Sequence, residues 1–537
     1  MRLLTSRGFL LFLVLVGAVL RGVQYFSKSS LRVDEAALAL NLLGRSFREL
    51  FEPLDLAQVA PWGFLAVEKG LFGLFGRNEL GLRLLPFFLS LLSLVFFERL
   101  SHRVVRGVAV PFAVGSFALG TGLIDYAGQL KQYSTDIAAA VGILLLAAVV
   151  EKSGLTLRRA LVLGIAGLLA CAFSQPVVFV LAGAGLSLVL LAAAKRIEAS
   201  APALGLLGAL WAAGAGFALW SGERTLTPDV KTYLRDFWAS GFMPLSPATA
   251  PVSWLWNQIA RVFEGFLEYP LPLLFVALLL VGAAGLFRRK PAWALFLLVP
   301  LLLTVAASAA RLYPFAPGRV TAFLVPVMLL LVAEGVERVH TLPLPRLTWL
   351  GTALAMIAGA CPVWAVVRNP PPYMPEQVRP ALERLRAEGK PGDALYVYYG
   401  ARLPYLFYAP VFDLLIGERV LGECARDNPR SYLKQVDALR GRPRAWVLLA
   451  HDLPLHSEGP LIFGYLDRIG RLLERTDFRS HGSFSAVVLA AWDLSDPDRL
   501  SAATSEAFPV PDLPKEALAG LPCAGTMGPL PASLQMR

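Results

Sequence analysis

Long apolar runs, separated by short polar segments, fill the first two thirds of the chain. Each run comes close to the roughly 20 residues that an α-helix needs to cross the hydrocarbon core of a bilayer. The runs predict eleven spans, at residues 8–24, 80–97, 107–124, 134–150, 159–174, 176–194, 203–220, 270–287, 292–309, 320–336 and 348–367. The pattern therefore predicts an α-helical polytopic membrane protein.

The pattern changes after residue 367. Short apolar segments typical of strands alternate there with segments of helical periodicity, which predicts a small α/β domain. The predicted strands are 394–400, 444–451 and 484–494, and the predicted helices are 375–389, 430–441 and 459–476. We expect three parts: a transmembrane domain at 1–367, an α/β domain at 368–499, and a disordered tail at 500–537 that is rich in Pro, Ser and Ala.

Two amphipathic segments lie between the first and second spans. Residues 34–45 and 61–75 each carry an apolar side, and the second begins with Trp62 and Phe64. Helices of this kind lie in the headgroup plane of a membrane. We therefore expect the first long loop to follow the membrane surface.

The composition excludes a soluble enzyme and a secreted disulfide scaffold. Apolar and aromatic residues make up 56% of the chain and charged residues only 17%, with a mean hydropathy of +0.58. An ordinary soluble domain has about 25% charged residues. Four cysteines in 537 residues are too few for a disulfide framework.

The net charge of +11 follows the expected topology. With the N-terminus in the cytoplasm, basic clusters such as Arg158–Arg159 and Arg288–Lys290 all fall in cytoplasmic segments, as the positive-inside rule requires. The topology therefore explains the excess of basic residues, and a nucleic-acid partner is not needed to account for it. This topology predicts a multi-pass protein of the cytoplasmic (inner) membrane with an extracytoplasmic C-terminal domain.

Asp34 and Glu35 form an acid pair directly after the first span. Carboxylates at a membrane surface can act as a general base or bind a metal ion. The alternative is structural, since acidic residues are favoured in the first turn of a helix. The pair alone does not decide between the two interpretations.

Further charged residues lie at the predicted outer ends of the spans. Lys131 and Asp136 flank the start of the fourth span, and Arg311 and Arg319 bracket the loop before the tenth. Ionisable groups in such positions are candidates for function, although a loop cap and a snorkelling lysine would also explain Lys131 and Asp136. The two arginines would suit a lipid phosphate or pyrophosphate, with an ordinary phospholipid headgroup as the alternative.

Four strings of residues together resemble the GT-C membrane glycosyltransferases. They are RVDEAALAL (32–40), QVAPWGFLAVEKGLFGLFGRNELGLRLLP (58–86), KQYSTD (131–136) and RLYPFAPGR (311–319). More narrowly, the strings resemble the family 39-like group within that class, which includes protein O-mannosyltransferases and the lipid A aminoarabinose transferase. It covers residues 5–367, and its motifs are specific only in combination.

The resemblance implies a function and roles for particular residues. Such proteins transfer a sugar, with inversion, from a polyprenyl-phosphate donor to an acceptor on the outer face of the membrane. Asp34 matches the acid that binds the acceptor hydroxyl as general base, and Glu35 matches the second acid. Lys131 and Tyr133 match a basic-plus-tyrosine pattern, and Asp136, Arg311 and Arg319 complete the expected substrate site.

One position departs from the family pattern. Related chains often carry Glu where this chain has Gln129. The missing acid puts a metal site in doubt, so a divalent ion stays an open option with unknown ligands and no other cofactor is expected. Besides the donor, membrane lipids are expected partners, and the acceptor is not identified.

Two rival functions stay open. A lipid or polymer transporter would place ionisable residues at mid-membrane, whereas here they lie at span edges. A degenerate, non-catalytic glycosyltransferase fold is the second rival, and Gln129 keeps it open. The enzyme hypothesis predicts that Asp34 and the Arg311 and Arg319 guanidinium groups lie within about 10 Å, leaving room for the reacting atoms.

Overall fold

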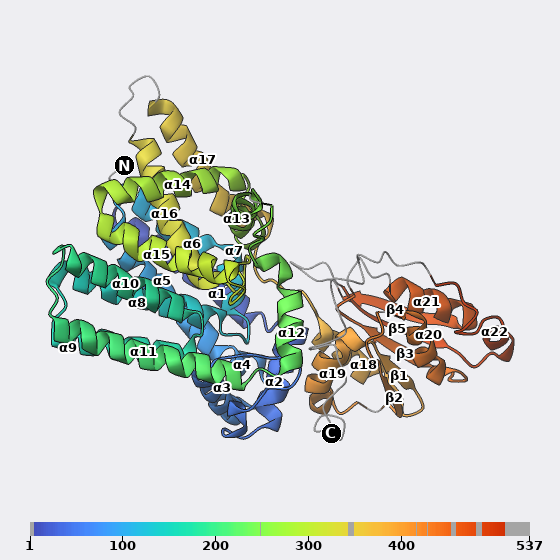
Figure 1. Ribbon diagram of the computed structural model, residues 1–537. Coiled ribbons are helices and arrows are strands. Elements are labelled where there is room, and N and C mark those ends of the chain that lie inside the picture. The colour runs from blue at the N-terminus through green and yellow to red at the C-terminus, as the bar shows by residue number, and fades with distance from the viewer. Residues whose placement is uncertain are drawn as a thin grey trace.

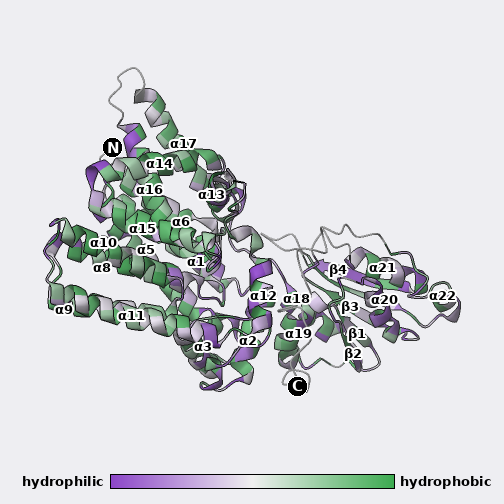
Figure 2. Ribbon diagram, viewed as in Figure 1, coloured by the Kyte–Doolittle hydropathy of each residue, from purple (hydrophilic) through white to green (hydrophobic). Residues whose placement is uncertain are grey.

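The protein consists of a helical membrane domain and a C-terminal α/β domain, which lies to one side of the helices (Figure 1). This computed structural model describes residues 5–247, 249–341, 348–414, 416–426, 428–452, 458–478 and 486–510. The membrane helices are mostly apolar, whereas polar residues gather on α12 (Pro228–Phe237) and in the α/β domain (Figure 2).

Each predicted span corresponds to a helix. These are α1 (Arg7–Phe26), α5 (Leu84–Val104), the bent pair α6 (Ala109–Leu119) and α7 (Thr121–Ala127), α8 (Tyr133–Ser153), α9 (Leu157–Phe173), α10 (Val177–Ala193), α11 (Ala201–Arg224), α14 (Pro272–Arg289), α15 (Pro291–Ala309), α16 (Val325–His340) and α17 (Thr348–Arg368). Seven of the helices in the described ranges are long and apolar enough to cross a membrane alone, and the α6–α7 pair makes an eighth. The helical membrane architecture is thus confirmed.

The loops between the spans also contain helices. They are α2 (Val33–Gly44), η1 (Glu49–Phe51), α3 (Trp62–Phe75), α4 (Glu79–Leu82), η2 (Ala239–Gly241), α13 (Ala250–Arg261), η3 (Val262–Phe266) and η4 (Ala322–Leu324). The two predicted amphipathic segments correspond to α2 and α3. Helix α2 is more enclosed than a surface helix, because α19 (Tyr399–Phe412) of the C-terminal domain packs on it.

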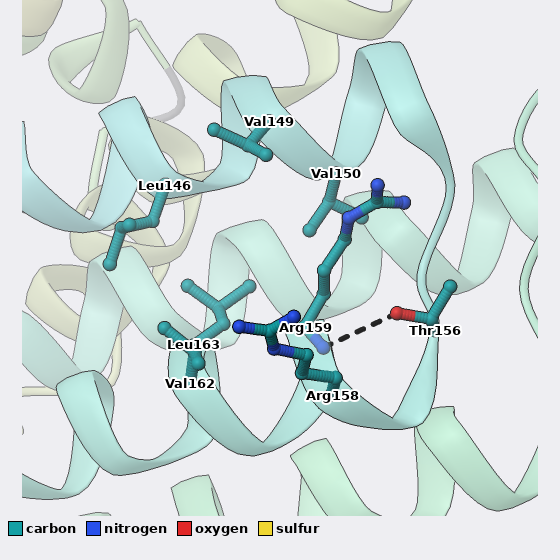
Figure 3. Close-up of a pocket in the computed structure, with 8 residues that line it drawn as sticks. All are labelled: Leu146, Val149, Val150, Thr156, Arg158, Arg159, Val162 and Leu163. Carbon is teal, nitrogen blue, oxygen red and sulfur yellow. Dashed lines mark hydrogen bonds between the residues drawn. The ribbon is translucent and has the colours of Figure 1, made fainter.

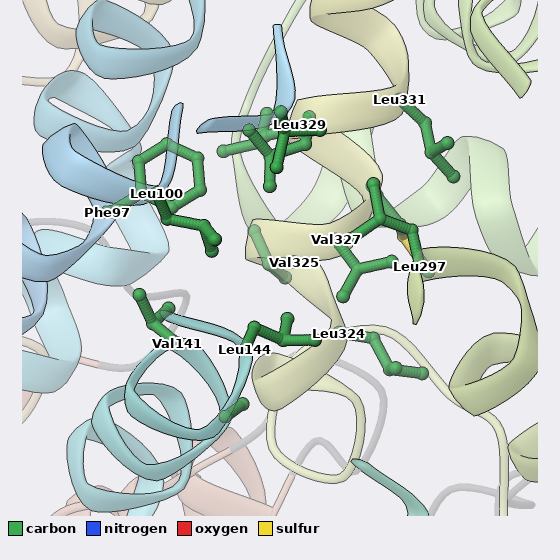
Figure 4. Packing of buried hydrophobic residues seen from close by; sticks show 14 of the residues in the cluster. Phe97, Leu100, Val141, Leu144, Leu297, Leu324, Val325, Val327, Leu329 and Leu331 are labelled. Carbon is green, nitrogen blue, oxygen red and sulfur yellow. The ribbon is translucent and has the colours of Figure 1, made fainter. Parts of the chain in front are cut away.

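Helix α16 forms the centre of the membrane domain. Every residue from Val325 to Glu337 is buried, which explains why this helix is apolar all round over most of its length. Its Leu and Val side chains face α5 at Phe97 and Leu100, and α8 at Val141 and Leu144 (Figure 4). The charged loops are thereby held at the two ends of one packed bundle.

Helices α14 and α16 approach each other closely through two glycines. A Cβ on Gly282 would lie 1.7 Å from the Leu331 carbonyl oxygen, and a Cβ on Gly335 would lie 2.0 Å from the Leu278 carbonyl oxygen. Small residues allow such backbone contact between membrane helices. This pair therefore depends on glycine at both positions.

The C-terminal domain contains a five-stranded sheet in the order β2-β1-β3-β5-β4. Strands β1 (Ala394–Val397), β2 (Glu418–Leu421) and β3 (Ala445–Leu449) are parallel, and β5 (Val487–Asp493) runs antiparallel to β3 and to β4 (Arg471–Phe478). The remaining elements are α18 (Val378–Glu388), α19, α20 (Arg430–Val436), η5 (Asp437–Leu439), α21 (Glu458–Ile469) and α22 (Pro497–Ser501). The predicted α/β class is confirmed.

Several details of this domain differ from the sequence prediction, among them strand β2, which was not predicted. The predicted helix 459–476 ends at Ile469, and the remainder forms β4 at the edge of the sheet. Helix α19 was not predicted, and it contains Pro404 and Pro410, residues that normally mark the end of a helix. Residues 500–510 are packed against the domain, where Arg440 bonds the Leu500 and Ala503 carbonyls, so the fold continues past the expected boundary. The rest of the expected tail, 511–537, lies outside the described residues.

The α/β domain is anchored on the first loop of the membrane domain. The Leu31 amide donates to the Tyr408 hydroxyl at 2.9 Å, and the Val33 amide donates to Glu376 Oε2 at 3.1 Å. Gln24 exchanges two hydrogen bonds with the Tyr373 backbone. These bonds fix the domain directly beside the start of α2.

Candidate active site

Asp34 lies in the first turn of α2, at the junction of the two domains. Its side chain is 21% exposed, and its Oδ2 atom lies 3.5 Å from Arg319 Nη1 and 3.8 Å from Lys131 Nζ. Arg319 belongs to the loop before η4, and Lys131 belongs to the turn between α7 and α8. Three segments far apart in the sequence thus bring one carboxylate and two cations together.

The cations determine the ionisation of Asp34. Burial would raise the pKa of this carboxyl, but Lys131, Arg319 and Arg32 outweigh it and hold the pKa well below its usual range. Asp34 is therefore a carboxylate at neutral pH. The same burial lowers the pKa of Lys131, although Asp34 counteracts this effect.

Lys131 is held in place by a neutral partner. Its Nζ donates to Gln58 Oε1 at 2.6 Å, and the side chain is 8% exposed. Arg319 has a more open environment, with 45% of its side chain exposed. The pair therefore offers one enclosed and one exposed cation to a ligand beside Asp34.

Glu35 differs sharply from its neighbour. It is fully buried, and its two oxygens accept hydrogen bonds from Arg83 at 3.0 and 2.9 Å, from the Leu130 amide at 2.7 Å and from the Arg32 amide at 3.1 Å. These bonds tie α2 to α4 and to the turn that carries Lys131. Such a fully engaged carboxylate suits a positioning role.

A second acidic group lies close to this cluster. Arg32 Nη2 donates to Asp125 Oδ1 at 2.6 Å, and Gln129 Nε2 donates to Asp125 Oδ2 at 2.7 Å. A glutamate at position 129 would instead place a like charge against Asp125. The departure from the family pattern is thus accommodated by a hydrogen bond that only the amide can donate.

The other predicted site residues are placed differently. Tyr133 begins α8 and packs against Tyr126, with 4.6 Å between ring centroids. Asp136, one turn further on, is buried, and its Oδ1 has no hydrogen-bond partner among the described residues. Arg311 is exposed and forms no ion pair within the described ranges, so it does not join the Asp34 cluster as Arg319 does.

Four residues near Asp34 were not predicted as site residues: Arg32, Gln58, Glu376 and His451. Arg32 belongs to the RVDEAALAL string, so its position next to the acid pair was a usable signal. Glu376 and His451 come from the C-terminal domain, and no local pattern connects them with α2.

The donor set does not suit a resident divalent cation. The described part of the chain contains no group of three His, Cys, Asp or Glu side chains arranged to hold a metal ion. Asp34 and Asp125 face Lys131, Arg319 and Arg32, which would repel a divalent cation. The side chains of the site are therefore the groups that could carry out its chemistry.

Two surface cavities lie away from the cluster. One, of about 300 Å³, is lined by Arg158, Arg159 and apolar residues such as Val149, at the end of α8 opposite Tyr133 (Figure 3). The other, of about 550 Å³, is lined by Glu264, Glu268, Trp364 and Arg368, among others. Neither includes Asp34.

No protein-family model matches the chain, and no curated protein matches it. Among solved structures, the Archaeoglobus fulgidus oligosaccharyltransferase in the apo form matches with a TM-score of 0.48 and 11% identity, over 83% of this chain and 70% of that one. ArnT from Cupriavidus metallidurans, bound to undecaprenyl phosphate, matches with a TM-score of 0.41 and 13% identity, over 90% and 98% of the chains. Both belong to the class of membrane glycosyltransferase that the sequence motifs resemble. Because their TM-scores lie below 0.5, we infer no function from these matches. The function is inferred from the geometry of the site.

Proposed function

We propose that this protein is a membrane glycosyltransferase that moves a sugar from a polyprenyl-phosphate donor to an acceptor hydroxyl, with inversion. The observation that carries the proposal is the partly exposed Asp34 carboxylate, 3.5 Å from Arg319 and 3.8 Å from Lys131. An acid and two cations at the end of a helical bundle match what this reaction needs at the level of lipid headgroups.

The cations would stabilise the leaving group. As the bond between the sugar carbon and the phosphate oxygen breaks, negative charge develops on the phosphate. Preorganised cationic side chains in a water-poor site stabilise such charge by several kcal/mol. Arg319, as the more exposed cation, would meet the phosphate first, and Lys131 would hold it from the buried side.

Asp34 would accept the proton of the acceptor. The acceptor oxygen attacks the sugar carbon from the side opposite the phosphate, and its proton passes to the Asp34 carboxylate. This back-side attack inverts the configuration at that carbon. A phosphate that draws Arg319 and Lys131 away would also weaken their hold on Asp34, so its pKa would rise towards a range suited to a general base.

The charge distribution supports an outward-facing site. Basic residues collect at the opposite end of the bundle, where Arg289 bonds the Val104 carbonyl and Glu334, and Lys290 bonds the Arg103 carbonyl. Positive residues favour the cytoplasmic side. We infer that Asp34 and the C-terminal domain face the outside of the cytoplasmic membrane, where lipid-linked sugars and membrane lipids are within reach.

The test compares the glycans, glycolipids and glycoproteins of the cell envelope by mass spectrometry, with and without this protein. The wild type should yield a modified product that the deletion lacks. Asp34→Asn keeps the shape of the side chain and removes the base, so the product should fall by about 10²-fold or more.

Asp229→Asn is the matched control, because Asp229 is an exposed acid on α12. It should leave the product unchanged. Asp34→Asn with a wild-type product level would refute the assignment of Asp34. Binding of undecaprenyl phosphate by the purified protein, with no product from the wild type, would instead favour a non-catalytic scaffold.

A further inference from the structure

The carboxyl ends of β1 and β3 carry an unassigned group of polar residues. Helix α19 leads from β1 to β2, whereas α21 leads from β3 to β4, in the opposite direction along the strand order. Connections that diverge in this way mark a topological switch point at the carboxyl ends of the two strands, the place where open α/β sheets commonly bind their ligands. His451 and Asp452 follow β3 at this point, and Tyr398 and Tyr399 follow β1.

His451 connects this end of the sheet to the segment that carries Asp34 through one buried acid. Its Nδ1 lies 2.6 Å from Glu376 Oε1, and Glu376 Oε2 accepts the amide of Val33, the residue before Asp34. Glu376 is 5% exposed, whereas the His451 side chain is 29% exposed. The imidazole is thus fixed at Nδ1, and Nε2 has no hydrogen-bond partner among the described residues.

The backbone of His451 is held in an unusual conformation. Its φ angle is +57°, in the left-handed region that residues other than glycine rarely adopt. Such conformations are energetically unfavourable and cluster at functional sites. Here the strain turns the chain at the end of β3, where the imidazole meets Glu376.

Neighbouring charges favour the protonated imidazole. Burial and Arg426 lower the pKa of His451, but Glu376 raises it more strongly and Asp34 adds a smaller contribution, so the pKa lies above its ordinary value. An imidazolium donates hydrogen bonds from both nitrogens. With Nδ1 directed to Glu376, the Nε2 proton is available to a ligand.

We propose that His451, oriented by Glu376, donates a hydrogen bond from Nε2 to an oxygen of the acceptor bound beside Asp34. The C-terminal domain would then form the acceptor-facing wall of the site, opposite the cations that hold the donor phosphate. This inference rests on the proposed glycosyltransferase function and assigns the acceptor an oxygen-rich headgroup, such as a sugar or a phosphorylated glycan.

Two amide variants distinguish the roles of the two ring nitrogens of His451. In His451→Asn the amide can still reach Glu376 but ends short of Nε2, whereas in His451→Gln the amide reaches the position of Nε2. His102→Asn is the control, because His102 is exposed and pairs with Glu98 at the basic end of α5. For each variant we would measure the envelope product by mass spectrometry, the affinity for undecaprenyl phosphate and the thermal unfolding midpoint of the purified protein.

We expect His451→Asn to lower the product by about 10-fold or more, the effect of losing one hydrogen bond to a charged donor. Its affinity for undecaprenyl phosphate should stay within about twofold of the wild type, and His451→Gln should recover part of the product. His102→Asn should match the wild type in all three measurements.

Three other outcomes are possible, and each would refute one part of the proposal. A wild-type product level in His451→Asn, with loss of product in Asp34→Asn, would overturn the role of His451 and leave the glycosyltransferase function standing. Equal loss of product, undecaprenyl phosphate binding and thermal stability in both His451 variants would show a structural role only. No product from the wild type would overturn the proposed function itself.

Discussion

Two adjacent acids in α2 have opposite environments. Asp34 keeps part of its carboxylate exposed between two cations, whereas Glu35 is buried with both oxygens bonded. Successive residues on a helix point about 100° apart, so one faces the site and the other faces the interior. The acid pair is therefore a partly exposed carboxylate followed by a buried anchor.

Glu35→Gln should destabilise the protein. Removing one partner of a buried ion pair leaves the other charge uncompensated and costs about 3–5 kcal/mol. Here that charge is Arg83, which is 2% exposed and also bonds Ser29. We expect a lower midpoint of thermal unfolding in detergent, measured against Glu52→Gln, which changes an exposed acid in the same loop. A midpoint equal to that of the wild type would contradict the anchoring role.

The sequence indicated the acid but not its surroundings. Asp34 follows the first span within a motif, so it was identified as a candidate base. Its contact with Arg319 joins segments 285 residues apart, and no local periodicity predicts such a pair. Arg311 shows the limit of this reasoning, since it lies in the same loop as Arg319 and yet outside the cluster.

At the scale of elements, the membrane domain depends on close helix packing. The α14–α16 pair is the clearest case, because the backbone of each helix contacts a glycine of the other. In lipid, where no hydrophobic force drives helices together, such packing contributes much of the association.

Gly282→Ala and Gly335→Ala should each force these helices apart. The added methyl group would meet a backbone carbonyl oxygen at 1.7 or 2.0 Å, and a carbonyl within a helix cannot rotate away. Overpacking of this kind costs about 1–3 kcal/mol, so the thermal midpoint should fall. Gly205→Ala on α11 is the control, since a Cβ there meets nothing within 4 Å, and it should leave the midpoint unchanged or slightly higher.

Hydropathy predicted the spans well because bilayer thickness sets their length. The errors lie in the C-terminal domain. The segment that forms β4 contains Leu, Glu and Arg, which favour helices, but pairing with β5 makes it an edge strand. Helix α19 was not predicted; Pro404 and Pro410 are unfavourable within a helix, and its packing on α2 and α18 stabilises it.

At the scale of the whole molecule, the two domains meet beside the proposed site. Glu376 and His451 belong to the α/β domain, and both lie beside the start of α2. Arg379, also from that domain, pairs with Glu79 of α4 at 2.9 Å. Charged groups therefore contribute to the docking as well as to the proposed chemistry.

The stability of this docked state should fall as the pH rises. The groups that face His451 are Glu376 and Asp34, which favour the imidazolium, and Arg426, which opposes it; together they raise the pKa above its ordinary value. The stabilisation is therefore complete below the unfolded pKa of about 6.5 and is lost as the pH rises through the higher folded pKa. We expect the wild type to unfold at a higher temperature than His451→Asn at pH 5.5, with the difference shrinking towards pH 8.5. A difference independent of pH would contradict this ion pair.

The contact between Val33 and Glu376 spans 343 positions of the chain. At a synthesis rate of about 5–20 residues per second, the ribosome reaches Glu376 roughly 20–70 seconds after Val33. During that interval the start of α2 has been made, but the partner that fixes it has not, and the intervening helices must be inserted first. Every newly made copy therefore passes through a period in which it is embedded in the bilayer but incomplete at the proposed active site. A nonsense mutation between residues 35 and 376 would leave the cell with a membrane-bound fragment that contains Asp34 but lacks Glu376, whose carboxylate holds the start of α2.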